Sequence, residues 1–156
     1  MRLRLVLTAA IALAIALAPP PASAALQFAA AIDGAQAATP STGSGTGAFT
    51  LNDAETSLSI NVSFGGLGSP QTAAHIHGPG APGVSAGVRF GLPLGSPVVT
   101  AWAIPAGDVT SLKNGLLYVN VHTQVYPGGE IRGQILSAVP ALPASWGKLK
   151  AIYASR

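Results

Sequence analysis

Short apolar runs separated by glycine and proline constrain the fold of this chain more than any other feature of its sequence. The 156 residues include 19 glycines and 13 prolines, which stand between the runs and form no repeat. In residues 57–64, hydrophobic and polar side chains alternate strictly. This is the period of a strand with one face in a core and the other in solvent, so the pattern predicts an all-β protein.

Seven segments have the length and composition of strands. They cover residues 26–33, 47–51, 57–64, 73–77, 98–103, 116–123 and 130–136. Seven or eight short antiparallel strands at this spacing are typical of a β-sandwich, of the immunoglobulin-like or superoxide-dismutase-like kind. Residues 105–115 form the one helical turn that the sequence predicts, with Asp108 available as its N-terminal cap.

The start of the chain has the composition of an export signal. Arg2 and Arg4 are followed by an apolar run over residues 5–18 and by the small residues Ala22-Ser23-Ala24. This order predicts a secretory signal peptide over residues 1–24, and therefore a periplasmic or secreted protein.

The rest of the chain is long enough for one domain, predicted over residues 25–136. Residues 137–156 contain prolines and three basic residues, and we expect a disordered tail there. Without the leader's two arginines, six basic residues remain against five acidic ones, so no basic surface for nucleic acid is expected. No segment after the leader has the 18 or so apolar residues of a membrane span.

The three histidines of the chain lie in two of the predicted strands. His75 and His77 are alternate residues of one strand, so their side chains point to the same face. Both rings can then reach one ion at a distance of about 2 Å, with His122 as a third ligand. Three imidazoles without a thiolate suit copper or zinc, and copper is favoured by intrinsic affinity. The alternative is that His75 and His77 only hydrogen-bond to the loop over residues 78–83.

A hairpin formed by residues 116–123 and 130–136 adds polar neighbours to His122. Counting from the turn places three pairs on one side of the sheet: His122 with Glu130, Asn120 with Arg132, and Tyr118 with Gln134. Glu130 is then predicted to accept a hydrogen bond that orients the His122 ring. For Glu130 and Arg132, the alternative is an ordinary ion pair on a solvated face.

These phrases resemble the CHRD domain, a module named after chordin and also found in exported bacterial proteins. The likeness rests on Ala74-His75-Ile76-His77-Gly78-Pro79 and on residues 116–123 and 127–134, and it extends from about residue 26 to residue 136. The resemblance implies an immunoglobulin-like β-sandwich and no defined chemistry. Ala37 departs from the family, which has a glutamate at the matching position.

A second resemblance is to copper–zinc superoxide dismutase, in which a His-x-His strand and a later histidine hold copper. It implies that His75, His77 and His122 are copper ligands, with Arg89 or Arg132 attracting an anion. Val88-Arg89 stands in the stretch similar to the one that supplies that enzyme's metal-bridging histidine. The resemblance therefore implies a copper site without the zinc site.

Two functions follow from the sequence. The first is a non-catalytic binding or structural module that contacts an extracytoplasmic protein or a cell-surface component. It is favoured because the chain has no hydrolase or phosphate-binding motif. The second is a copper- or zinc-binding protein with a three-histidine site. A bound copper ion would add redox chemistry like that of superoxide dismutase. A third, lesser possibility is pH sensing by the histidines.

Overall fold

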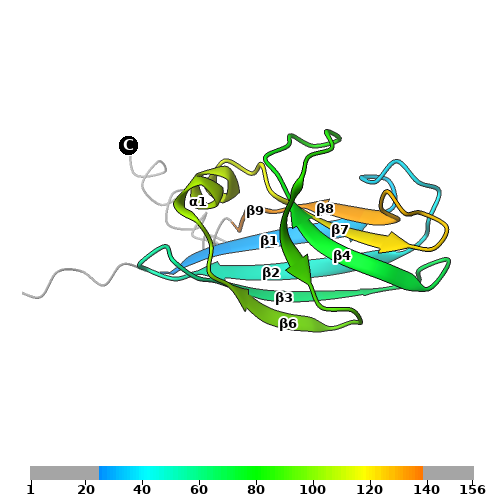
Figure 1. The fold of residues 1–156 in the computed structure, drawn as a ribbon, viewed down its shortest axis with the longest axis horizontal. Helices are drawn as coiled ribbons and strands as arrows, with labels where there is room; N and C mark the ends of the chain where they lie inside the picture. The colour runs from blue at the N-terminus through cyan, green and yellow to red at the C-terminus, as the bar shows by residue number, and fades with distance from the viewer. Residues whose placement is uncertain (1–24, 139–156) are drawn as a thin grey trace, which may run out of the picture.

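A computed structural model describes residues 25–138, which consist mainly of β-strands with one short helix (Figure 1). The predicted signal peptide over residues 1–24 and all but the first two residues of the predicted tail lie outside the described residues. The elements are β1 (Leu26–Asp33), β2 (Ser44–Leu51), β3 (Leu58–Gly65), β4 (Gln71–His77), β5 (Val88–Leu92), β6 (Val98–Trp102), α1 (Ala106–Lys113), β7 (Tyr118–Thr123), β8 (Ile131–Gln134) and β9 (Leu136–Ser137).

The described strands form one antiparallel sheet in the order β5-β4-β7-β8-β1-β2-β3-β6, with β9 paired to β1. Only the pair Asp33 and Arg132 joins β1 to β8. The sheet bends there into two halves, and its two ends, β5 and β6, touch each other. The predicted all-β sandwich is thus confirmed, and its near closure gives it a barrel-like form.

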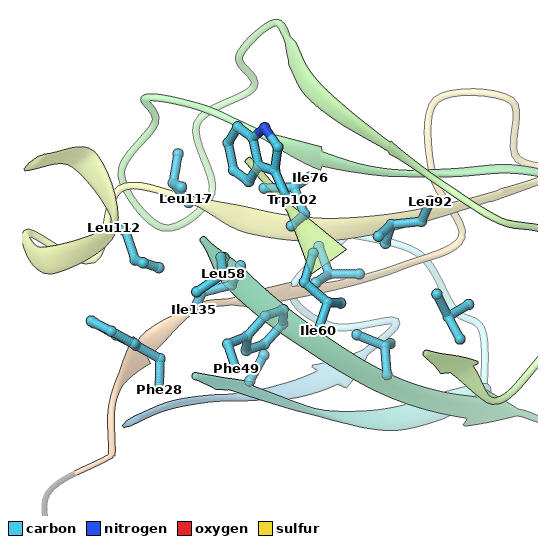
Figure 2. Close-up of a cluster of buried hydrophobic side chains, with 14 of the residues drawn as sticks. Phe28, Phe49, Leu58, Ile60, Ile76, Leu92, Trp102, Leu112, Leu117 and Ile135 are labelled. Atoms are coloured by element: carbon cyan, nitrogen blue, oxygen red, sulfur yellow. The ribbon is translucent and has the colours of Figure 1, made fainter. Parts of the chain in front are cut away.

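The core lies between the two halves of the sheet (Figure 2). In β3, Leu58, Ile60 and Val62 are fully buried while the serines and the asparagine between them are exposed, as the alternation predicted. Leu112 of α1 is also buried, so the helix covers part of this core (Figure 2). Burying a side chain of this size stabilises the fold by about 1.5–3 kcal/mol.

β5 was not predicted as a strand. Of its five residues only Leu92 is buried, so the segment lacks the alternation that marks a half-buried strand. β9 was not predicted as a separate strand, because its two residues are too few to show an alternation of hydrophobic and polar side chains.

The predicted role of Asp108 as a helix cap is wrong. Pro105 is the residue before the helix, and no side chain caps it. The buried Asp108 carboxylate instead accepts hydrogen bonds from Nε and Nη2 of Arg89 at 2.7 and 2.9 Å. A charge-assisted pair with both carboxylate oxygens is stronger than a cap to one backbone N–H. The Arg89 guanidinium is therefore already paired with a carboxylate of the protein and is not free to attract another anion.

Candidate metal centre

The two histidine-bearing strands are neighbours in the sheet. β4 and β7 are antiparallel, with His75 opposite Asn120 and His77 opposite Tyr118. His122 lies two residues beyond Asn120, on the same face, and is therefore a diagonal neighbour of His75. This register brings together three histidines that are up to 47 residues apart in the chain.

The three rings form a compact group, here called the histidine cluster (His75, His77 and His122). One nitrogen from each ring can be chosen so that all three lie within 4.8 Å of one another. Nδ1 of His75 and Nε2 of His122 are 3.1 Å apart. Nitrogens that share one ion at about 2 Å lie roughly 3–4 Å apart, so the cluster needs only a small adjustment to hold one.

Backbone carbonyls fix which nitrogen each ring offers. Nδ1 of His77 lies 2.9 Å from the Ala86 oxygen, and Nδ1 of His122 lies 2.8 Å from the Pro127 oxygen. Because a carbonyl only accepts hydrogen bonds, both Nδ1 atoms carry the proton and both Nε2 atoms keep a lone pair. In the metal-free protein, Nε2 of His122 accepts a hydrogen bond from Nδ1 of His75, while the buried Nε2 of His77 has no hydrogen-bond partner. The donor set for an ion is therefore Nε2 of His77 and His122 with Nδ1 of His75, whose proton would move to the other nitrogen of the ring.

The surroundings favour neutral rings, the form that binds a metal. Burial lowers the pKa of His75, and repulsion from a charged His122 or His77 lowers it further. Burial also lowers the pKa of His77; the hydrogen bond to Ala86 opposes this shift, while His122 and Arg132 add to it.

These shifts predict that the metal-free protein loses stability as the pH falls. Below the ordinary histidine pKa of about 6.5, the unfolded chain binds protons that the folded rings reject, so the free energy of unfolding decreases with falling pH. Urea unfolding with a chelator at pH 7.5 and pH 5 measures this loss, which we expect to be smaller in His75→Ala. An equal loss in the two proteins would show that other groups cause it.

The predicted contact between Glu130 and the His122 ring is wrong. Glu130 is fully buried, and Oε1 accepts hydrogen bonds from Ser41 Oγ at 2.6 Å and from the Gly68 N–H at 2.7 Å. Oε2 accepts one from Thr123 Oγ1 at 2.7 Å. A buried carboxylate requires several donors, which β7 and two loops supply here, and the His122 ring is oriented by a backbone carbonyl instead.

The other two predicted pairs are present. Asn120 is opposite Arg132 and Tyr118 is opposite Gln134. The His77 ring stacks on Tyr118 with centroids 5.2 Å apart, and the Arg132 guanidinium carbon lies 3.5 Å from the centre of the Tyr118 ring. Arg132, Asn120 and Gln134 are all buried, so the alternative of a solvated face with a Glu130–Arg132 ion pair is also wrong.

Sequence reasoning missed the carbonyls of Ala86 and Pro127, which orient two of the rings. A backbone oxygen carries no residue-type signal, and its position depends on loops folded by long-range contacts. The sequence indicated only that loops rich in glycine and proline follow both histidine strands.

The family model of the CHRD domain matches residues 28–135. No curated protein and no solved structure matches the sequence significantly. CHRD domains in general occur in extracellular or secreted proteins, and the family supports a non-catalytic binding module. Within residues 25–138, no helix is both long and apolar enough to cross a membrane. The match covers more than two thirds of the chain, which therefore belongs to the CHRD domain family.

Proposed function

We propose that this protein is an exported binding module that holds one copper ion with His75, His77 and His122. The observation that carries the proposal is the convergence of three imidazole nitrogens within 4.8 Å of one another. The predicted signal peptide and the family support the location in the periplasm or outside the cell.

The alternative, histidines that only hydrogen-bond to loops, leaves part of the geometry unexplained. In His77 and His122 the hydrogen bonds to carbonyls use Nδ1 alone. The buried Nε2 of His77 has no partner, and an unsatisfied buried polar group costs about 1–3 kcal/mol. A metal ion at the centre of the cluster would satisfy this atom and both of its neighbours.

The donor set favours copper over zinc. Imidazole nitrogens suit both ions, and the intrinsic affinity of such a site is higher for Cu(II) than for Zn(II). The cluster offers three protein ligands, as many as an open zinc site has, so the number of ligands does not separate the two ions. The fourth position would be left to water or to a ligand supplied by a partner.

Metal analysis tests the proposal. The protein, purified without a polyhistidine tag, is dialysed against Cu(II) or Zn(II) and its bound metal is measured. We expect one Cu(II) per chain, weaker binding of Zn(II), and loss of stoichiometric binding in His122→Ala. Absence of bound metal, or equal binding by the variant, would refute the metal site and leave a binding module without it.

A further inference from the structure

A cleft with a volume of about 460 Å³ lies on the same side of the sheet as the histidine cluster. Loops after β1 and β4 form its rim, and side chains of β7 and β8 form its floor. Its lining includes Ala35, Pro82, Ser85, Tyr118, Arg132 and Gln134. None of the three histidines lines it, so it is separate from the proposed metal centre.

Arg132 lies in this cleft as a buried cation without a counter-ion. Its side chain is almost covered, with 6% of the residue exposed. The ion pairs in residues 25–138 are Arg89 with Asp108 and Lys113 with Glu55, and neither involves Arg132. A buried charge without a partner is unfavourable, because the protein replaces its water with weaker dipoles.

The existing contacts hold the guanidinium in place and leave two of its nitrogens, Nε and Nη1, without a partner. Nη2 donates to the Ala81 carbonyl at 3.2 Å and to Oε1 of Gln134 at 3.3 Å, and the flat face lies on Tyr118. Within the described residues, Nε and Nη1 form no hydrogen bond. Both remaining donors are therefore available to a ligand in the cleft.

We propose that the cleft binds a small organic carboxylate, which pairs with the buried charge of Arg132 and accepts a hydrogen bond from one of its free nitrogens. A carboxylate neutralises the guanidinium, and a hydrogen bond between two charged groups is stronger than one between neutral groups. Arg132 is the only charged residue in the lining, so the charges balance for a monocarboxylate. The volume is that of a small-molecule site, and Ala35 and Pro82 supply apolar walls for the body of the ligand.

Calorimetric titration with benzoate tests the site, with a chelator present so that the metal centre plays no part. We expect saturable binding of benzoate and no binding of benzyl alcohol, which has a similar shape without the charge. Arg132→Gln should weaken benzoate binding by at least about tenfold, since hydrogen bonds to a charged group are lost.

Two further variants separate the cleft from general charge effects. Ala35→Phe keeps the guanidinium but fills the cleft from an exposed position, and we expect it to weaken binding as well, even where Arg132→Gln fails to fold. Lys113→Gln removes an equal charge from the exposed ion pair with Glu55, outside the cleft, and it should leave binding unchanged. Unsaturable benzoate binding, unchanged binding in Ala35→Phe, or tighter binding of inorganic phosphate than of benzoate would overturn the proposal.

Discussion

The His77→Leu variant is expected to bind Cu(II) at least about 100-fold more weakly than the wild type, because even loss of a group that only orients a ligand costs about 10–100-fold. The stability of the metal-free protein should change by less than about 1 kcal/mol, since two effects of similar size oppose each other. Leucine removes the unpaired, buried Nε2, which is stabilising, and also removes the hydrogen bond to Ala86, which is destabilising.

Gln71→Leu is the matched control for this experiment. Gln71 lies at the other end of β4, and its Nε2 is also buried without a partner. Both variants thus replace an unsatisfied nitrogen by leucine on the same strand, but only one removes a proposed ligand. Competition titrations against a chelator give the affinities, and urea unfolding gives the stabilities. If both variants bind Cu(II) as the wild type does, His77 is a structural residue and not a ligand.

The Glu130→Ala variant is expected to lose about 3–5 kcal/mol of folding free energy, one of the largest effects of any single substitution. It deprives Ser41, Thr123 and the Gly68 N–H of their common acceptor and opens a cavity in a fully buried place. Glu130→Gln should lose about 1–2 kcal/mol, because the amide keeps one acceptor oxygen. Thermal or urea unfolding measures both.

Glu55→Gln is the control for the charge change. Glu55 forms an exposed ion pair with Lys113, so this variant should change the free energy of unfolding by less than about 1 kcal/mol.

The response of stability to acid gives a second test of Glu130. Burial raises the pKa of Glu130, but hydrogen bonds from Ser41, Thr123 and Gly68 outweigh it and hold the pKa below the usual value. The wild type should therefore lose stability as the pH falls below the unfolded carboxyl pKa of about 4.3, and Glu130→Gln should lose less. Equal stabilities of Glu130→Gln and Glu55→Gln would contradict the anchoring role of Glu130.

Strand positions were predictable because alternation is a local property of the chain. The strand β1 has its predicted ends, and β3 buries Leu58, Ile60 and Val62 of its alternating run, while Phe64 is only partly buried. The hairpin register was also local, since the short turn before Glu130 limits how β7 and β8 can pair. β5 escaped prediction because its burial depends on β4 beside it and not on its own pattern.

The sequence by itself determined that His75 and His77 share a face, because side chains alternate along a strand. It also determined that Asn120 and Tyr118 lie opposite Arg132 and Gln134, because the short turn of the hairpin sets its register. Only the tertiary structure decided that β7 lies beside β4, which brings His122 to the pair. It also decided that Glu130 meets donors from β7 and from two loops, that Asp108 pairs with Arg89, and that Arg132 keeps two nitrogens without a partner. These outcomes depend on which hydrogen-bond donors and acceptors, far apart in the chain, come together in the fold. A local sequence pattern does not show which of them will pair.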